Sequence, residues 1–360
     1  MARVLCAMSG GVDSSVAAHL LKEAGHEVLG VFLRLGPDAA GRAQGASEGA
    51  RRSCCSIEDS RDAALVAGRL GIPFYALNAQ EDFGRIIDHF TAEYHRGRTP
   101  NPCVLCNHWI KFGSLLEKAR ALGCDALATG HYARADRGPD GRPRLLRAAD
   151  PAKDQSYFLF LLGPEVLGMA LFPVGGLSKA EVRRIARERD LPVADKPDSQ
   201  EICFVPGDYR EVLEARDPGC IKEGRFEDSQ GTDLGLQPGH QNFTVGQRRG
   251  LGRAFGEPRY VVRIDAARNV VVLGSREDLV SGSLRAADVR WISIPEPAPG
   301  GTLEAQVRIR HRHRAAPARL RVEAPGRVLV DFDEPQSAVT PGQAAVFYDG
   351  DVVLGGGWIE

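Results

Sequence analysis

Short apolar runs alternate with amphipathic helical stretches along the first third of this chain. The runs that predict strands are residues 4–8, 28–33, 74–77 and 126–129. Helical stretches lie between them, one stopping at Gly25 and another covering residues 58–70. Because strands and helices in alternation form a parallel sheet covered on both faces, we expect a doubly wound α/β domain.

Two segments of this region lack a periodic apolar face, and we expect both to be loops. Residues 36–53 are rich in Gly and Ala, and residues 97–107 contain two prolines between two helical stretches. Farther on, Ser178 and Glu181 match a capping box that opens a helix through about Arg189.

The pattern changes at about residue 206, where Gly and Pro punctuate short apolar stretches. Beyond residue 282, alternating runs at 303–309, 320–322 and 328–332 predict antiparallel strands in a barrel or a sandwich. We therefore expect three domains: an α/β catalytic domain (1–210), a small α+β linker domain (211–281) and a C-terminal antiparallel β-barrel (282–360).

Composition narrows the classes of partner and compartment. The 360 residues are 43% hydrophobic and 26% charged, an ordinary globular balance, and 46 Lys+Arg against 47 Asp+Glu leave a net charge of −1. A polyanionic partner would therefore need a local basic patch. No apolar run approaches the roughly 18 residues of a membrane span, and no signal peptide is visible, so we expect a cytoplasmic protein. Eight cysteines are too few for a disulfide scaffold and are read as thiols, metal ligands or catalysts.

The sharpest chemical signal is the string S-G-G-V-D-S-S at residues 9–15, between a predicted strand and a predicted helix. Two glycines permit a tight turn whose N–H groups point at an anion, and the helix presents its positive end to the same place. A bare Gly-Gly turn would more often bind nothing. No lysine follows the glycines, which excludes the G-x-x-x-x-G-K-S loop; the string resembles the PP-loop of ATP pyrophosphatases.

A second constellation is T-P-N-P-C-V-L-C-N at residues 99–107. Its C-x-x-C spacing suits half of a zinc site, a redox pair that could form a disulfide, or two incidental cysteines, and no second ligand pair follows at zinc-ribbon spacing. Cys203 is a third candidate, about 100 residues farther on.

Six motifs in one order make the resemblance specific and extend it over essentially the whole chain. They are residues 9–15, residues 99–113, A-T-G-H-Y at 128–132, K-D-Q-S-Y at 153–157, S-Q-E-I-C-F at 199–204 and V-G-Q-R-R-G at 245–250. Together they resemble the tRNA-specific 2-thiouridylases of the PP-loop ATP pyrophosphatase superfamily.

The resemblance implies ATP- and Mg²⁺-dependent 2-thiolation of the wobble uridine of tRNA. ATP adenylates the C2 oxygen, and protein-bound sulfur then displaces AMP, which is a good leaving group from an otherwise poor electrophile. Cys106 is implied as the nucleophile and Cys203 as the carrier of a persulfide. The implied partners are tRNA and a sulfur donor or sulfur-relay protein, and we expect a monomer without a membrane association.

The same resemblance assigns binding residues. The ATP-binding positions are Ala7, Met8, Ser9, Gly10, Gly11, Val12, Asp13, Ser14, Leu33 and Gly130. The residues flanking the flipped target base are Asn101, Pro102 and Cys103. The tRNA contacts are Lys153, Asp154, Gln155, Arg310 and His311. The last two lie in R-I-R-H-R-H-R at 308–314, which we expect to be a basic strand; a solvated face is its alternative role.

Many members of the family have Asp where this chain has Cys103. Three converging thiols, Cys103, Cys106 and Cys203, would suit a 4Fe–4S cluster with one open iron. The competing route uses the persulfide on Cys203, with Cys103 as a bystander; three thiolates also suit zinc.

Two other functions compete with thiolation. A PP-loop ligase that adenylates a small molecule would need neither three placed cysteines nor a basic run. A non-catalytic RNA-binding protein would bind tRNA equally well after Cys106→Ala.

Overall fold

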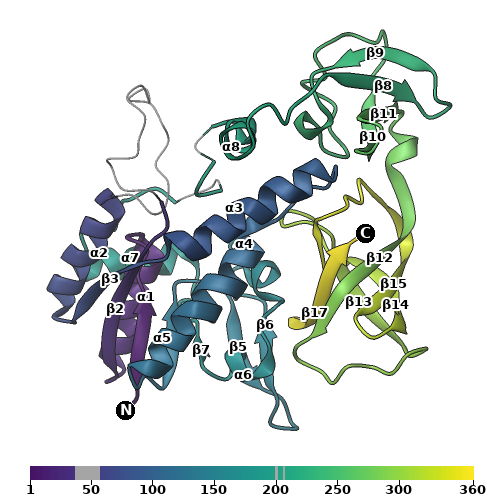
Figure 1. Ribbon diagram of the computed structural model, residues 1–360. Coiled ribbons are helices and arrows are strands. Elements are labelled where there is room, and N and C mark those ends of the chain that lie inside the picture. Colours follow the sequence, from purple (N-terminus) through teal and green to yellow (C-terminus); the bar gives the residue numbers. More distant parts are fainter. Residues whose placement is uncertain (37–56, 199–201, 206) are drawn as a thin grey trace.

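The computed structural model describes residues 1–36, 57–198, 202–205 and 207–360. Most of the loop expected at 36–53, together with Cys54, Cys55 and residues 199–201 of the S-Q-E-I-C-F motif, lies outside the described residues. Within them, three bodies follow one another along the chain (Figure 1). None of the described helices is long and apolar enough to cross a bilayer.

The first body is built on a parallel sheet whose order is β3-β2-β1-β4-β7. Its strands are β1 (Arg3–Ala7), β2 (Glu27–Arg34), β3 (Phe74–Asn78), β4 (Ala126–Thr129) and β7 (Ala170–Leu171). Side chains alternate between the two faces, so Val4 and Cys6 belong to one buried cluster and Leu5 to the other. Burial raises the pKa of Cys6 to about 12, as expected for a thiol that serves as a small core residue.

Helices cover both faces of this sheet and confirm the doubly wound prediction (Figure 1). One layer holds α1 (Val12–Glu23), α2 (Ile57–Leu70) and α7 (Lys179–Glu188), and the other holds α3 (Gln80–His95) and α5 (Leu115–Ala121). The capping box at the start of α7 forms as predicted, because the Ser178 hydroxyl accepts from the Glu181 N–H and the Glu181 carboxylate accepts from the Ser178 N–H.

The segment 97–107 is not the uninterrupted loop that its prolines suggested. After Asn101 the chain forms α4 (Pro102–Leu105) and then η2 (Cys106–Ser114), a π-helical stretch. Pro102 occupies the first helical turn, where a missing N–H costs no hydrogen bond, so this proline starts a helix. The C-x-x-C pair therefore lies on helical backbone.

The middle body is a four-stranded sheet of order β10-β11-β8-β9, built around the buried rings of Phe226 and Phe243. Its strands are β8 (Gly224–Asp228), β9 (Asp233–Gln237), β10 (Tyr260–Asp265) and β11 (Val270–Gly274). The preceding helix α8 (Tyr209–Arg216) packs against α3, where the rings of Tyr94 and Tyr209 stack 4.5 Å apart.

The third body is an antiparallel barrel, not a sandwich, because its first and last strands pair with each other. The strands are β12 (Val280–Trp291), β13 (Thr302–Arg308), β14 (Ala316–Ala324), β15 (Arg327–Ser337), β16 (Ala344–Asp349) and β17 (Val352–Ile359). The hairpin of β5 (Arg134–Arg137) and β6 (Pro143–Leu146) from the first body adds to β17, a pairing that the sequence pattern did not predict.

The basic run 308–314 is a turn and not the strand that we expected. β13 ends at Arg308, and the His313 N–H donates to the Arg310 carbonyl, which reverses the chain before β14. The turn leaves Arg310, Arg312 and Arg314 exposed while Ile309 stays buried. The charges thus project from the end of a hairpin.

Candidate functional site

The glycine-rich loop joins β1 to α1 and is closed by its own side chains. The Ser14 hydroxyl accepts from the Ser9 N–H at 3.1 Å and donates to the Gly11 carbonyl at 3.1 Å. Gly10 has φ +73°, and a Cβ there would lie 2.2 Å from the Asp59 carbonyl oxygen. Only glycine fits this position, both for its backbone conformation and for its contact with α2.

Two other predicted nucleotide positions lie at the same carboxyl edge of the sheet, where parallel α/β folds bind ligands. Gly130 directly follows β4, and a Cβ on it would lie 2.5 Å from the Ser14 backbone nitrogen, so this strand end abuts the first turn of α1. Leu33 is half-buried near the end of β2. The fold therefore brings Ser14 in the first turn of α1, Gly130 after β4 and Leu33 on β2 to one edge of the sheet.

A lysine from another part of the chain completes this loop. Lys179, the first residue of α7, donates to both carboxylate oxygens of Asp13 at 2.7 and 2.8 Å. The Tyr132 hydroxyl donates to the same carboxylate at 2.7 Å. Burial, and then the negative charge of Asp13, raises the pKa of Tyr132, so this phenol remains a donor.

Asp198 links this lysine to the predicted tRNA-contacting segment. Its carboxylate lies 2.8 Å from Lys179 Nζ, 2.8 Å from Lys153 Nζ and 3.0 Å from an Arg183 nitrogen. Burial opposes ionisation of Asp198, but the hydrogen bonds from Lys153 and Lys179 outweigh it and keep its pKa below the usual value. The chain of contacts Asp13–Lys179–Asp198–Lys153 thus joins the two predicted binding regions.

A second lysine holds the loop from the side of α2. Lys196 donates to the Gly10 carbonyl at 2.9 Å and to Asp59 at 2.6 Å, and it also pairs with Asp62. Burial disfavours its charge, yet the hydrogen bonds to Asp59 and Asp62 raise its pKa, so the ammonium stays protonated. No local spacing relates Lys179, Lys196, Tyr132 and Asp198 to the glycine loop, so the sequence pattern did not predict these contacts.

The cysteines named by the sequence lie on adjoining elements. Cys103 is in α4, and Cys106 is the first residue of η2. Cys106 and Cys203 pack, half-buried, against the same hydrophobic cluster of the first body. The residue after Cys203, Phe204, anchors its segment on α3, with ring centroids 5.4 Å from Phe83 and 5.1 Å from Phe90. The tertiary structure therefore returns Cys203 to the region of the C-x-x-C helix.

Among the described residues, Cys103, Cys106 and Cys203 are not grouped as the ligands of a single metal ion. In the described ranges, three or more metal-ligating side chains meet only at His95, Asp217 and Cys220, whose donor atoms lie within 4.8 Å of one another. His95 and Asp217 already form an ion pair there, at 3.3 Å. Within the described part of the chain, neither a zinc site nor an iron–sulfur cluster is supported at Cys103, Cys106 and Cys203.

Asp154, one of the expected tRNA contacts, is buried beside the start of the basic turn. It is 4% exposed, and its carboxylate accepts from the Ala148 and Ser156 N–H groups and from Arg308 at 3.0 Å. A buried carboxylate with these partners orders the backbone around it. Its partner Arg308 starts the basic turn, so Asp154 anchors that turn to the first body.

The neighbouring predicted positions do lie together. His311 packs its ring 4.5 Å from that of Phe158, whose carbonyl accepts from the Asn107 side chain at 3.2 Å. Gln155 accepts from the Tyr132 N–H at 3.0 Å. The basic turn, the segment after Lys153 and the C-x-x-C helix therefore meet around the short helix η3 (Ser156–Leu159).

His131 is held as a neutral imidazole beside the glycine loop. Its Nε2 lies 3.5 Å from Lys111 Nζ, and its Nδ1 lies 2.7 Å from the Thr129 hydroxyl. Burial, and then the charge of Lys111, lowers the pKa of His131 well below its usual value. Nε2 is thus an acceptor for Lys111, and Nδ1–H donates to Thr129.

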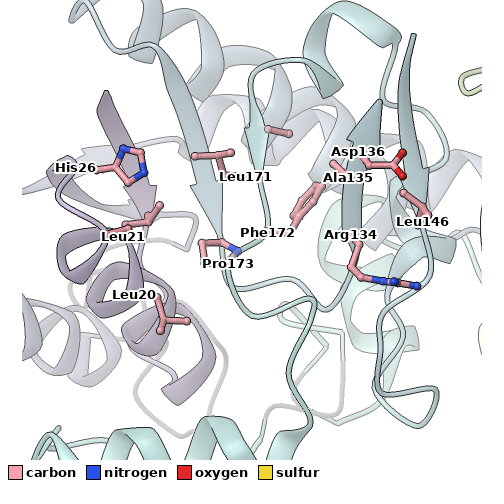
Figure 2. Close-up of a pocket in the computed structure, with 12 residues that line it drawn as sticks. Leu20, Leu21, His26, Arg134, Ala135, Asp136, Leu146, Leu171, Phe172 and Pro173 are labelled. Atoms are coloured by element: carbon pink, nitrogen blue, oxygen red, sulfur yellow. The ribbon is translucent and has the colours of Figure 1, made fainter. Parts of the chain in front are cut away.

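The larger of two prominent cavities is separate from this chemistry. It measures about 470 Å³ and is lined by Leu20, Leu21 and His26 at the carboxyl-terminal end of α1 and beyond, and by Arg134 and Phe172 opposite them (Figure 2). None of the predicted site residues lines it. The glycine loop is at the other end of α1.

Comparisons with known proteins match the three bodies of this chain in the same order. Family profiles match in succession: the tRNA methyl transferase HUP domain at residues 2–207, the tRNA methyl transferase PRC-barrel domain at 216–275 and the Aminomethyltransferase beta-barrel domain at 281–359. A solved NMN synthetase from Francisella tularensis is 15% identical, covers 60% of this chain and 76% of its own, and has a TM-score of 0.34, too low to bear on function.

Full-length relatives are far more similar. The tRNA-specific 2-thiouridylase MnmA of Geotalea uraniireducens (strain Rf4) is 52% identical over 361 residues, covering 99% of this chain and 95% of its own. Those of Geobacter metallireducens (52%; 99% and 96% covered) and Chloroflexus aggregans (50%; 100% and 98% covered) are comparable. This chain therefore belongs to the family of tRNA-specific 2-thiouridylases.

Proposed function

We propose that this protein is an ATP-dependent tRNA sulfurtransferase that converts the wobble uridine of tRNA to 2-thiouridine. The observation that carries the proposal is that one body holds a phosphate-type glycine loop together with the Cys106 and Cys203 segments, while the basic turn of the barrel is anchored to that body by the Arg308–Asp154 ion pair. A ligase for a small molecule has no use for the turn, and an RNA-binding protein has no use for the loop.

ATP is held in this proposal by the loop at residues 9–14, with Gly130 and Leu33 at its edges. The Lys179 and Lys196 ammonium groups lie on two sides of the loop and would meet the phosphates, since both are charged and hydrogen-bonded to its residues. Mg²⁺ would be held by carboxylate oxygens, the donors that this ion prefers, and the carboxylates of Asp13 and Asp198, which share Lys179 as a partner, are the candidates beside the loop.

The chemistry proceeds in two displacements. The C2 oxygen of uridine attacks the α-phosphate, and pyrophosphate leaves. The terminal sulfur of a persulfide on Cys203 then attacks C2, and AMP leaves. The Cys106 thiolate attacks the Cys203 sulfur, so that 2-thiouridine is released and a Cys106–Cys203 disulfide remains for a reductant to reopen.

The remaining roles are proposals of the same kind. Asn101, Pro102 and Cys103 would flank the flipped base, and Lys153, Asp154, Gln155, Arg310 and His311 would contact tRNA. The partners are tRNA and a sulfur donor or relay protein, and we propose a monomer that acts in the cytoplasm.

The test is incubation with ATP, Mg²⁺, cysteine plus a cysteine desulfurase, and unmodified tRNA, followed by nucleoside analysis. We expect 2-thiouridine from the parent protein and none from Cys106→Ala or Asp13→Ala. AMP release that depends on a metabolite and not on tRNA would favour the ligase. Absence of 2-thiouridine with every sulfur source, including sulfide, would refute the proposal.

A further inference from the structure

A cavity of about 420 Å³ lies where the three bodies of the protein meet. Thr99, just before α4, contributes from the catalytic body; Gly246, Tyr260 and Arg276 contribute from the middle body; Arg310 and Gln343 contribute from the barrel. Figure 1 shows the same junction, with the end of α3 directed toward the space between the middle body and the barrel. No side chain of the site described above except Arg310 belongs to it.

The chemistry of the lining suits an anion. Two guanidinium groups, Arg276 and Arg310, border the cavity, and both side chains belong to exposed residues. Hydroxyl donors surround them, from Thr99, Thr244, Tyr260, Ser337 and Thr340. Over the described residues, no Asp or Glu lines the cavity. Guanidinium groups and hydroxyls are the side chains that bind phosphate oxygens.

The walls of the cavity are fixed to one another before any ligand arrives. The Gln343 amide donates to the Thr99 carbonyl at 3.0 Å, and the Thr99 N–H donates to the Pro341 carbonyl at 2.8 Å. Gly246 has φ +90°, and a Cβ there would lie 2.8 Å from the Cβ of Ala338 in the barrel. Because these walls are already ordered, less conformational entropy is lost when a ligand binds between them.

Gly246 belongs to the motif V-G-Q-R-R-G, which is part of neither the glycine loop nor the cysteine segments. Its N–H donates to the Val261 carbonyl at 2.8 Å, which holds the motif against β10 and beside Tyr260. The positive φ and the close approach to Ala338 both require glycine. The motif therefore forms the middle body's share of this cavity.

The position of the cavity identifies the occupant. Thr99 is four residues before Cys103, a separation that spans at most about 14 Å of chain. We propose that the cavity binds a phosphodiester of the tRNA backbone next to the nucleotide whose base enters the catalytic site. The ligand class is single-stranded RNA backbone, held by Arg276 and Arg310 with the Tyr260 ring beside it. This inference rests on tRNA being the substrate, as proposed above.

The test compares Arg276→Gln with Arg263→Gln, a matched control on the exposed face of the same body and outside the cavity. Affinity for tRNA is measured over a series of KCl concentrations. We expect Arg276→Gln to weaken binding about tenfold and to make the salt slope shallower by about one unit, since one phosphate contact is lost. Arg263→Gln should match the parent. Unchanged affinity and slope in Arg276→Gln would overturn the proposal.

Two further readouts separate the alternatives. At saturating tRNA, Arg276→Gln should thiolate at the parental maximal rate, because the residue binds backbone and not the reacting atoms. If Arg276→Gln instead abolishes thermal stabilisation by inorganic phosphate while tRNA binding stays parental, the cavity takes a free anion and the proposal fails. If the parent binds tRNA through Arg276 but forms no 2-thiouridine, the cavity assignment stands and the proposed enzymatic function fails.

Discussion

The Lys179 ammonium lies 2.7 and 2.8 Å from the two carboxylate oxygens of Asp13, although 166 residues separate the two positions. The glycine loop contains no lysine of its own, so α7 supplies through space the cation that a G-x-x-x-x-G-K-S loop carries in sequence. The same ammonium lies 2.8 Å from Asp198. A bound polyphosphate would compete with both carboxylates for Lys179.

Lys179→Met tests this arrangement. We expect tRNA-dependent release of AMP to fall by about 10- to 100-fold, the loss of one charge-assisted hydrogen bond to the phosphates, while the dissociation constant for tRNA stays unchanged. Lys118→Met, an exposed position on α5, is the matched control. AMP release at the parental rate in Lys179→Met would show that α7 only braces the loop.

The basic turn is tested by the double variant Arg310→Ala/Arg312→Ala. Both side chains are exposed at the end of the β13–β14 hairpin, and we expect weaker tRNA binding with a salt slope shallower by up to about two units. Affinity for ATP should not change, because the glycine loop is in the first body and the basic turn is in the barrel. Arg319→Ala/Arg321→Ala on β14 removes the same charge and serves as the control. If both double variants behave alike, the turn acts only through general charge.

The three cysteines are expected to differ in their contribution to sulfur transfer. Cys106→Ala and Cys203→Ala should each abolish 2-thiouridine formation, whereas Cys103→Ala should retain most of it, since the persulfide route needs two thiols. Iron and acid-labile sulfide are measured on anaerobically prepared protein, and the iron-free protein is assayed with a persulfide donor. Loss of both cluster and activity in Cys103→Ala would favour the 4Fe–4S route.

Acid should destabilise the fold through His131. Its pKa is held well below the usual value in the folded state, whereas the unfolded chain takes up a proton near pH 6.5. Stability is therefore fully present above about pH 6.5 and falls as the pH drops below it, by up to about 1.4 kcal/mol per pH unit. Urea unfolding at about pH 7.5 and about pH 5.5 should show a smaller loss for His131→Asn than for the parent. Equal losses in the two proteins would contradict this assignment.

The sequence determined the strands of the first sheet and the start of one helix, because interactions between neighbouring residues specify them. The alternation of apolar runs located β1, β2, β3 and β4, and the capping box located the start of α7 at Ser178, because side-chain period and N-cap hydrogen bonds involve neighbouring residues. The glycine loop was recognisable for the same reason, since the turn conformation at Gly10 and the closing bond from Ser14 lie within a few residues.

Two local interpretations were wrong: the uninterrupted loop expected at residues 97–107 and the strand expected at residues 308–314. Prolines in the segment 97–107 suggested a loop, but Pro102 begins a helix, as proline in a first turn often does. Alternation in the basic run suggested a strand, but the His313–Arg310 hydrogen bond turns the chain there. The resemblance places Asp154 among the tRNA contacts, and the tertiary structure adds that its buried carboxylate pairs with Arg308.

The sequence by itself determined the elements, the glycine loop and the family, because these are properties of short segments and of their order. Tertiary structure alone decided which distant groups meet: Lys179 with Asp13, Asp198 with Lys153, β12 with β17, and the three walls of the cavity at Arg276 and Arg310. Such contacts depend on how helices pack on sheets and how strands close a barrel. A one-dimensional pattern carries no distances between residues that are far apart in the sequence, so the geometry of the site appears only when the chain has folded.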